Sequence, residues 1–393
     1  MPTPLSLVDD VAAESDVRPR VLVVARRPVG GLRTHLLLTW TALRDAGFAF
    51  TFVGPADESL DRLRAAFGAS ADADFVGAAI ESRRCRLWPV VRDLLHDGCF
   101  ALLQSHGVTA AAHAALANLP LSVPHLTVLH EPLHAPRSPS WLGRLKHWAL
   151  EQALRRSDAI VAVSEDVRSS LSEISPVFRS LAERVSTIPN GIETRGYTFA
   201  PELPLADLHR RLGSETRSIL IGFPACTPKG GDVLALLEAA RRLQRPIHLV
   251  GFDAKSAVPP RVSEDVVVTL DSATDVRVLL PQLDLLVLLS GEEASGYAAM
   301  AALSAGVPVL AADAPGLRRL LRGTPAAVVT SRDPAALTEG LRSALDDSAS
   351  ARTRNYIPQA RARFALGDSI RRWTTILESS ARGARRSASR QTA

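Results

Sequence analysis

Lysine is nearly absent from this chain of 393 residues, because only three of its 46 lysine and arginine residues are lysine. These are Lys146, Lys229 and Lys255, and every other cationic side chain is an arginine. Such a bias is typical of a GC-rich genome. In a chain of this kind a cation that only solvates the surface is expected to be arginine, so each lysine is a candidate for a special role.

Cysteine is scarce as well. Cys85, Cys99 and Cys226 are odd in number and form no CxxC pair, which argues against a disulfide framework and against a thiolate zinc site. The first sixteen residues are acidic and lack the basic and apolar regions of a signal peptide. We therefore expect a cytoplasmic protein.

Charge of one sign and long apolar runs are also lacking. A net charge of +5 over this length is mild, far below the dense basic surface of a nucleic-acid binder, so no nucleic-acid partner is expected. The longest uncharged stretch, residues 98–130, is interrupted by Gln104, by histidines and by two prolines, which disfavours a transmembrane helix. With 46% hydrophobic and 22% charged residues, the composition is that of a globular protein.

The first half of the chain alternates strand and helix patterns. The β-branched run Val21–Arg26 leads through a glycine pair into a segment of helical periodicity, and the apolar run 48–54 follows directly. Further strands are predicted at 100–106, 125–132 and 159–164, and residues 184–193 are expected to carry a strand into an Asn-Gly turn. This βαβ rhythm predicts a parallel sheet.

The same rhythm restarts after a polar, proline-containing stretch near residue 200, with apolar runs such as 218–224, 246–252 and 284–289. Two successive doubly wound α/β halves are the economical interpretation. We predict the following organisation: a flexible N-terminus over 1–18, a first Rossmann-like domain over 19–192, a second over 193–366, a last helix over 367–382, and a disordered arginine- and serine-rich tail over 383–393.

One short motif suggests zinc chemistry. Residues 130–134 read HEPLH and match the H-E-x-x-H pattern of zinc peptidases, which needs both histidines on one helical face. The preceding run is a strand and Pro132 would break a helix, so we regard the match as accidental. His130 by itself follows a parallel strand, where ligands of open α/β sheets bind; a satisfied loop histidine is an equal alternative.

Two glycine-rich turns are candidates for anion binding. Gly30 and Gly31 follow the first strand, where a plain tight turn is the alternative because no G-x-G-x-x-G pattern is present. Lys229, Gly230 and Gly231 occupy the equivalent turn of the second half. A lysine ammonium beside the free N–H groups of a helix start suits a diphosphate, and the rarity of lysine strengthens this hypothesis.

The densest group of candidate residues follows the apolar strand at 284–289. Glu292 and Glu293 precede Ala294, Ser295 and Gly296, after which a helix of small residues is predicted. Its free N–H groups suit sugar hydroxyls or phosphate, and Glu293 could accept from hydroxyls. An acidic pair that only stabilises a helix dipole is the alternative.

Taken in order, these segments resemble the family 4 retaining glycosyltransferases over nearly the whole chain from Val21 to about Leu377. Eight pieces carry the likeness: GGLRTHLLLTWTALRDAG, SHGVTAAAHAALA, VPHLTVLHEP, ALRRSDAIVAVSEDVRSSL, RVSTIPNGIE, KGGDVLALLEA, EEASGYAAMAALSAGVPVLAAD and DPAALTEGLRSALDD. The resemblance implies a GT-B fold, in which two Rossmann-like domains face a cleft and the last helix, here with Trp373, crosses back to the first domain.

The resemblance also implies roles for individual residues. Gly30 and Gly31 would lie near the donor phosphates and the acceptor, His130 would contact the donor sugar, and Lys229 with Gly230 would hold the diphosphate. Glu293 matches the first glutamate of the family's Glu-x7-Glu motif, with Ala294, Ser295 and Gly296 beside it. Asn190 and Gly191 match the interdomain hinge. No metal or other cofactor is implied, because lysine and helix dipoles neutralise the charge.

Two positions depart from the family pattern. The arginine usual before the KG pair falls at Phe223, and the second motif glutamate falls at Ala301. Arg33 is a candidate replacement cation from the opposite domain. The expected activity is retaining transfer of a hexose-like sugar from a nucleotide donor, in the biosynthesis of polysaccharide, glycolipid or a glycosylated metabolite. The alternative is a degenerate, non-catalytic GT-B protein acting as a partner or regulatory subunit.

The sequence gives less information about the acceptor substrate. A helix over residues 141–156 would carry Trp141, Leu145 and Trp148 on one side and Arg144, Lys146 and His147 on the other, a composition suited to an anionic membrane surface. A buried helix with a solvated basic face is an equally good interpretation. Glycan, lipid-linked and small-molecule acceptors all stay open.

Overall fold

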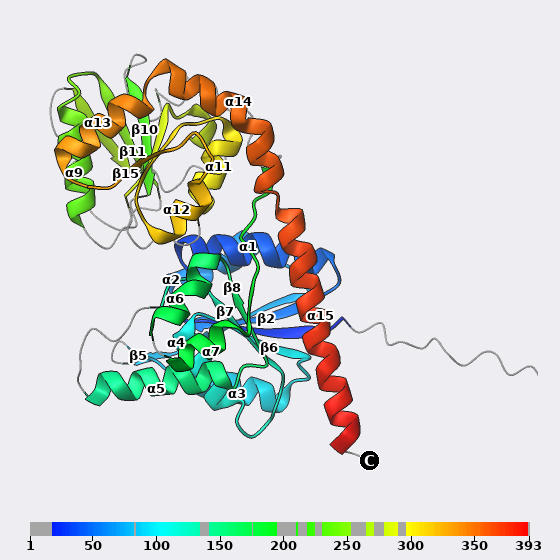
Figure 1. The fold of residues 1–393 in the computed structure, drawn as a ribbon. Coiled ribbons are helices and arrows are strands. Elements are labelled where there is room, and N and C mark those ends of the chain that lie inside the picture. The colour runs from blue at the N-terminus through cyan, green and yellow to red at the C-terminus, as the bar shows by residue number, and fades with distance from the viewer. Residues whose placement is uncertain are drawn as a thin grey trace, which may run out of the picture.

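The computed structural model describes two α/β domains, one above the other in Figure 1. It covers the following residues: 18–81, 84–133, 141–174, 176–194, 210, 218–224, 230–252, 265–270, 279–289 and 296–391. The two successive Rossmann-like domains expected from the strand and helix rhythm are confirmed.

The first domain is built on a seven-stranded parallel sheet of order β3-β2-β1-β6-β7-β8-β9. The strands are β1 (Arg20–Ala25), β2 (Ala49–Pro55), β3 (Ala73–Ala78), β6 (Leu102–His106), β7 (His125–Leu129), β8 (Ala159–Ala162) and β9 (Val185–Thr187). The short strands β4 (Ile80–Glu81) and β5 (Arg84–Cys85) pair antiparallel beside it. The helices are α1 (Gly30–Asp45), α2 (Glu58–Phe67), α3 (Leu87–Asp97), α4 (Val108–Ala117), α5 (Trp141–Arg155), α6 (Glu165–Ile174) and α7 (Pro176–Ala182).

Strand β1 shows why its sequence is apolar at nearly every position. Side chains of a strand alternate between the two faces of the sheet, and here both faces are covered by helices. Val21 and Val23 belong to a core shared with Trp40 of α1, whereas Leu22 and Val24 belong to a second core with α3 and α4. A central parallel strand buried on both sides therefore reads as a continuous apolar run.

The second domain is built on a six-stranded parallel sheet of order β12-β11-β10-β13-β14-β15. The strands are β10 (Ile219–Pro224), β11 (Ile247–Phe252), β12 (Val266–Leu270), β13 (Leu285–Leu288), β14 (Val309–Ala312) and β15 (Ala327–Val329). The helices are α9 (Gly230–Arg241), the 3₁₀ turn η2 (Leu280–Gln282), α11 (Tyr297–Ala305), α12 (Pro315–Leu321), α13 (Pro334–Ala344) and α14 (Asp347–Arg363).

The helix termini follow local chemistry. Asp333 caps α13 by accepting from the backbone N–H groups of Ala335 and Ala336, and Pro334 occupies the first helical position, where its missing N–H costs nothing. Gly306 ends α11 with a positive φ of 81°. Both helices therefore begin or end at residues whose side chain or backbone suits that position.

The last helix ties the domains together. Helix α15 (Leu366–Gln391) runs from the second domain down along the first, and Trp373, 1% exposed, lies in the core formed by Val21, Trp40 and their neighbours. This confirms the predicted crossover. The expected disordered tail from residue 383 is wrong over the described residues, since the helix continues to Gln391. Alanine, arginine and glutamine are good helix formers, which explains the extension.

The two connections between the domains lie against each other. The backbone N–H of Ile192 donates to the carbonyl of Phe364, and that of Leu366 donates to the carbonyl of Ile192, at 2.9 Å in both cases. A Cβ atom on Gly191 would lie 2.7 Å from the Cα of Leu366 and 3.0 Å from the carbonyl oxygen of Ala365. Only glycine permits this approach, which gives the predicted hinge motif a steric reason.

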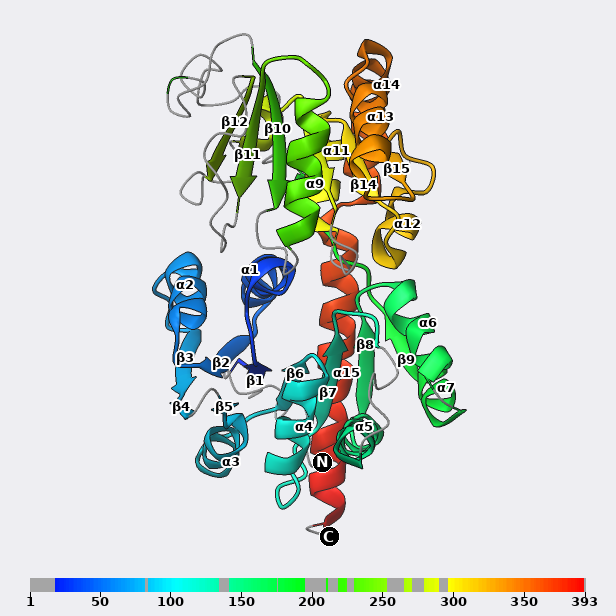
Figure 2. The same ribbon diagram turned by 90° about the vertical axis from the view of Figure 1, so that its left-hand side faces the viewer.

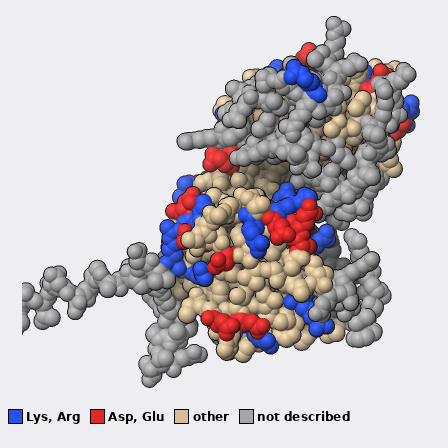
Figure 3. Space-filling view, turned by 180° about the vertical axis from the view of Figure 1, so that it is seen from behind, with Lys and Arg blue, Asp and Glu red and all other residues tan. Residues whose placement is uncertain are grey.

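Surface charge on the described residues is mixed. On the face seen in Figure 3, cationic and acidic side chains lie interspersed over the first domain. Several are paired there or elsewhere on the surface, as Arg18 is with Asp72 at 2.6 Å and Arg20 with Asp74 at 3.2 Å. No helix in the part of the chain that the structure describes is long and apolar enough to cross a membrane.

Candidate functional site

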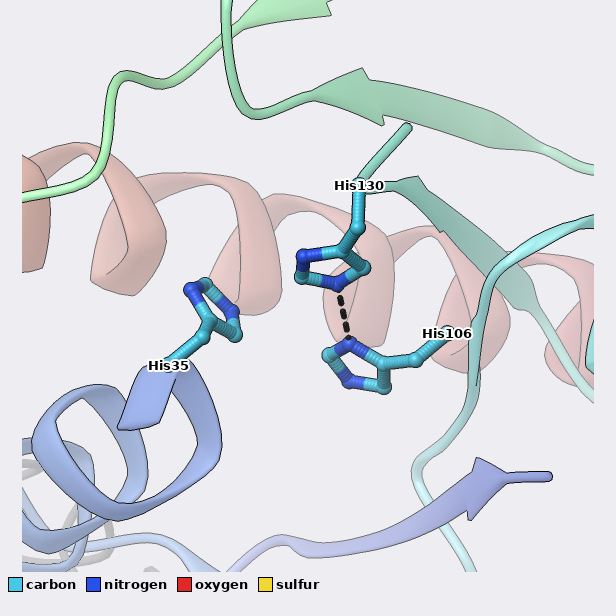
Figure 4. Close-up of side chains that lie close together, drawn as sticks. All are labelled: His35, His106 and His130. Atoms are coloured by element: carbon cyan, nitrogen blue, oxygen red, sulfur yellow. Dashed lines mark hydrogen bonds between the residues drawn. The ribbon is translucent and has the colours of Figure 1, made fainter. Parts of the chain in front are cut away.

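Three histidines from separate segments meet where the strands of the first sheet end (Figure 4). His106 is the last residue of β6 and His130 directly follows β7, the strand next to it, while His35 comes from the second turn of α1. His35 and His106 are 1% and 3% exposed, and His130 is partly buried. The carboxyl ends of parallel strands are where ligands bind in open α/β folds.

The three rings are in direct contact. Nδ1 of His106 and Nε2 of His130 are 2.9 Å apart and share a hydrogen bond, and the two rings stack with centroids 5.1 Å apart. His35 meets the ring of His130 edge-on at 4.8 Å and an interplanar angle of 72°. Figure 4 shows the ring of His35 pointing from α1 toward the pair formed by His106 and His130. The three therefore form one packed unit.

Burial keeps this unit uncharged. It lowers the pKa of His35 to about 4, against an ordinary value of 6.5, although a hydrogen bond to Asn190 works in the opposite direction. Burial also lowers the pKa of His106 and of His130 well below that value, and the neighbouring rings add to the effect because two imidazolium charges repel. At neutral pH all three rings are neutral hydrogen-bonding groups.

His35 also joins the hinge and the second domain. Its Nδ1 lies 3.1 Å from Oδ1 of Asn190, in the connection between the domains, and 3.3 Å from the hydroxyl of Tyr297. Tyr297 is the first residue of α11, and burial raises the pKa of its phenol well above 10. The histidine unit therefore adjoins both the hinge and the start of a helix in the second domain.

The spacing of this unit fits hydrogen bonding better than a metal. One nitrogen from each ring lies within 4.8 Å of the others. Tetrahedral zinc holds imidazole nitrogens at about 2.0–2.1 Å and hence about 3.3 Å from one another, so the rings would have to move to bind it. In addition, the closest pair of nitrogens already shares a proton. The peptidase hypothesis finds no support either, because residues 130–133 are not helical and His134 lies outside the described residues.

Several residues singled out in the sequence take positions that suit a ligand. Gly30, with a φ of 54°, begins α1, and Gly31 and Arg33 lie in the first turn of that helix. Gly230 begins α9 and Gly296 caps α11 with a left-handed φ of 64°. The left-handed φ favours glycine at this position, and a Cβ there would also lie 2.4 Å from a terminal methyl group of Leu320, which would have to shift. The N-termini of α1, α9 and α11 present backbone N–H groups that have no acceptor within their own helix.

The remaining predicted residues, Lys229, Glu293, Ala294 and Ser295, lie outside the described residues. The strands that precede them are neighbours, because β10 pairs with β13 through Ile221 opposite Leu285. The segments carrying Lys229 and Glu293 therefore leave the sheet from adjacent strand ends.

The two departures from the family pattern are filled by core residues. Phe223 is 3% exposed and packs with Leu236, Leu237 and other residues beneath α9. Ala301 is 2% exposed and lies in the core that α11 forms with its neighbours. Neither position faces solvent. In this chain both are filled by apolar side chains that pack in a core, in place of the charged side chains of the family pattern.

One cation that the sequence did not indicate lies beside the predicted diphosphate turn. Nη1 of Arg332 is 3.2 Å from both carboxylate oxygens of Asp232, in the first turn of α9, and 3.3 Å from the carbonyl of Leu289 at the end of β13. A hundred residues separate Arg332 from Asp232, so no local pattern could reveal the pair. The sequence-based candidate for an additional cation, Arg33, lies in the other domain.

Comparison with known proteins agrees with this arrangement. The model described as Glycosyltransferase Family 4 matches residues 29–195, and Glycosyl transferases group 1 matches residues 223–347. These are the two domains of the structure, in the same order along the chain.

Curated relatives are distant. The D-inositol 3-phosphate glycosyltransferase of Xylanimonas cellulosilytica is 28% identical over 218 residues, 50% of this chain and 51% of that protein. The glycogen synthase of Mycobacterium tuberculosis is 27% identical over 259 residues, 62% of this chain and 60% of that protein. The matched segments thus span about half to three fifths of these relatives.

Solved structures share the whole fold. Anabaena HepE in complex with UDP-glucose superposes with a TM-score of 0.72 at 17% identity, covering 92% of this chain and 99% of that one. Sucrose-phosphate synthase from Thermosynechococcus elongatus gives 0.69 at 15% identity, covering 92% and 99%. The two parallel-sheet domains and the crossing C-terminal helix are those of the GT-B fold, and the two family models, matched in order along the chain, show that it resembles the family 4 glycosyltransferases.

Proposed function

We propose that this chain transfers a sugar from a nucleoside diphosphate donor to an acceptor hydroxyl, with retention of configuration and without a metal. The observation that carries the proposal is the meeting of His130, at the carboxyl edge of the first sheet, with His35 and Tyr297 at the interface between the domains. This edge faces the helix starts at Gly230 and Gly296, which follow the strand ends of the second sheet.

The mechanism relies on electrostatics. As the bond between sugar and diphosphate breaks, negative charge grows on the departing phosphate. Lys229 and the N-termini of α9 and α11 stabilise that charge, in the way that fixed donors aimed at a developing anion do. The acceptor hydroxyl attacks on the face that the diphosphate leaves, which retains the configuration. His130 and Glu293 orient the sugar for this attack.

The remaining residues complete the donor site. Backbone N–H groups around Gly30, Gly31 and Gly296 approach the ligand closely because no Cβ intervenes. Arg33, in the first turn of α1, supplies a cation from the acceptor-side domain. Asn190 holds the hinge through His35. With lysine and helix dipoles neutralising the diphosphate, the reaction needs no metal ion.

A donor screen tests the proposal. UDP-glucose, which HepE holds in its solved structure, heads a set of nucleotide sugars that differ in base and sugar. We expect at least one to raise the melting temperature and to release its nucleoside diphosphate, detected by mass spectrometry. Lys229→Ala should lose the release. A matched control is Lys255→Ala, which removes another of the three lysines. If no nucleotide or nucleotide sugar shifts the melting temperature, the proposal is wrong.

The alternative function, a non-catalytic GT-B protein acting as a partner or regulatory subunit, is motivated by Phe223 and Ala301. Their burial weakens this alternative, because both residues are part of well-packed cores. The donor screen separates the two functions. Binding without any release in the presence of varied acceptors would favour the regulatory protein.

A second observation concerns the acceptor. Leu145 and Trp148, three residues apart on α5, are 50% and 58% exposed, and α5 carries the basic residues noted above. We propose that this helix touches an anionic membrane surface on the cytoplasmic side, which would bring a lipid-linked acceptor within reach. Flotation with anionic liposomes should capture the protein and lose the Leu145→Ser/Trp148→Ser variant. Leu234→Ser, at a 61% exposed position of the other domain, is the control. If none of the three proteins floats, a soluble acceptor is favoured, and equal flotation of all three would show that α5 is not the membrane contact.

A further inference from the structure

The hydrogen bond between His106 and His130 can run in either of two directions. A neutral imidazole carries one N–H, so one ring donates and the other accepts. If Nδ1 of His106 accepts, the proton of His106 must sit on its other nitrogen, Nε2. If Nδ1 donates, Nε2 keeps only a lone pair. The surroundings of Nε2 therefore decide the direction, because imidazole protons are assigned from the partners that they meet.

Nε2 of His106 is buried and has no hydrogen-bond partner among the described residues. An orphaned N–H in a protein interior is rarer than an acceptor with an unused lone pair. The arrangement with Nδ1–H of His106 donating to Nε2 of His130 is thus the one that leaves no buried donor unsatisfied.

His35 follows the same pattern. Its Nδ1 faces the amide oxygen of Asn190 at 3.1 Å, which can only accept, so the proton lies on Nδ1. Nε2 of His35 is then an unprotonated nitrogen, and it too is buried without a partner in the described part of the chain. Both buried rings therefore carry their proton on Nδ1. The Nδ1–H group of His35 donates to Asn190 in the hinge, and that of His106 donates to His130.

We infer that His106 is a positioning residue: by donating to Nε2 it holds His130 as the Nδ1–H tautomer, which presents an N–H donor to the oxygen atoms of the donor sugar. His35, packed edge-on against the same ring, fixes its orientation. The tautomer of His130 follows from the structure alone, whereas its contact with the sugar rests on the proposed function. Neither His35 nor His106 was a candidate in the sequence.

Two variants of nearly equal size test the direction of this hydrogen bond, since one keeps a donor at position 106 and the other offers only an acceptor. The amide nitrogen of Asn can donate from the place of Nδ1, so His106→Asn should keep His130 in the Nδ1–H form. The carboxylate of His106→Asp only accepts, so it should draw the proton of His130 to Nε2. His106→Leu removes the hydrogen bond without adding a charge and serves if the Asp variant does not fold. His113→Asn, on α4, is the control for an unrelated histidine.

The first readout is the ¹⁵N NMR tautomer of His130 in uniformly ¹⁵N-histidine-labelled protein, which needs no substrate. We expect Nδ1–H in the wild type and in His106→Asn, and Nε2–H or a doubly protonated ring in His106→Asp. In His106→Leu the two tautomers should be mixed. A wild-type His130 in the Nε2–H form, or a tautomer that does not change between the Asn and Asp variants, would overturn the inference.

The second readout is donor turnover. His106→Asn should keep kcat within about tenfold of the wild type, whereas His106→Asp should lose about 100-fold in kcat, the size expected when a contacting group is misplaced. Equal losses in the two variants would show a merely structural role. A protein with the expected tautomers that binds no nucleotide sugar would contradict the proposed function and leave the tautomer result standing.

Discussion

The two domains share a fold and differ in what they bury at the centre of their sheets. In the first domain the neighbouring strands β6 and β7 carry Gln104, Ser105, His106, His125 and Thr127, all almost fully buried. In the second domain the corresponding central strands β13 and β14 carry only leucine, valine and alanine. The same architecture thus supports polar, titratable central strands in one half and apolar central strands in the other, where the buried His248 lies on strand β11.

This difference separates two ways to build a site. The first domain places chemistry on the strands themselves, where Ser105 is 2.8 Å from Nε2 of His125 and His106 bonds to His130. The second domain uses apolar central strands to hold glycine-started helices, whose N–H groups are the binding groups in the function proposed above. The first domain should therefore be sensitive to pH, and the second should be sensitive to charges placed in its core.

The largest expected effect comes from placing a charge beneath α9. Phe223→Arg buries a guanidinium among Leu236, Leu237 and their neighbours, and we expect a loss of about 3–5 kcal/mol in the free energy of unfolding. Urea denaturation measures it, with the apolar substitution Phe223→Leu as the control, which should cost less than about 1.5 kcal/mol. An Arg variant of native stability that also gains affinity for a nucleotide would show instead that position 223 belongs to a decayed donor site.

The next effect is the pH dependence of stability. The pKa of His35 and that of His125 are both lowered to about 4 by burial. The unfolded chain therefore binds more protons than the folded one as pH falls below 6.5, and stability declines from there until about pH 4. Between pH 7 and pH 5 we expect a loss of about 2 kcal/mol for each ring.

Denaturation at pH 7, 6 and 5 measures this loss. The double variant His35→Asn/His125→Gln removes two of the buried rings and should make the profile shallower over the same range, and the slope that remains comes from His106 and His130. A wild-type stability that does not change between pH 7 and pH 5 would contradict the view that the first domain buries neutral histidines.

A smaller effect is expected at the hinge. Gly191→Ala forces a Cβ against the backbone of Leu366 and Ala365, which should destabilise the protein by about 1–3 kcal/mol, the usual cost of overpacking. The control is Gly367→Ala in the first turn of α15, where a Cβ meets only the side chain of Arg371 at 3.7 Å. Thermal unfolding that ranks the two variants the other way would show that the connections do not touch in solution.

The smallest effect tests the contact between the two halves. Tyr297→Phe removes the hydroxyl that lies 3.3 Å from Nδ1 of His35, at an expected cost of about 0.5–1 kcal/mol. A double-mutant cycle with His35→Leu isolates the pair. Additive effects of the two substitutions would mean that the domains are not coupled through this contact.

The sequence predicts the two sheets because apolar runs and glycine turns are local patterns, whereas the hinge and the crossover helix were expected from the family resemblance. It also places His130, since one strand end suffices to do so. It could not predict His35 and His106 as partners of His130. Their contact depends on the strand order β1-β6-β7, which brings together residues up to 95 positions apart.

Burial was hidden for a similar reason. The sequence marked Phe223 and Ala301 as missing charges, whereas the structure shows both inside apolar clusters. The orientation of a side chain at a strand end or within a small-residue helix depends on which helices cover the sheet. These helices come from distant parts of the chain, so the residues around each position do not reveal the orientation of its side chain. The last helix was drawn too short because composition alone does not separate an arginine-rich tail from a charged helix.

The central claim is retaining transfer from a nucleotide sugar, and time-resolved ¹H NMR of the donor's anomeric proton tests it most directly. The purified chain is mixed with the donor selected in the screen, and the signal of the first released or transferred sugar is followed before mutarotation. The account predicts loss of the donor signal with a product of the same anomeric configuration, and no loss with Lys229→Ala. A product of inverted configuration, or no turnover with any donor and acceptor, would contradict it.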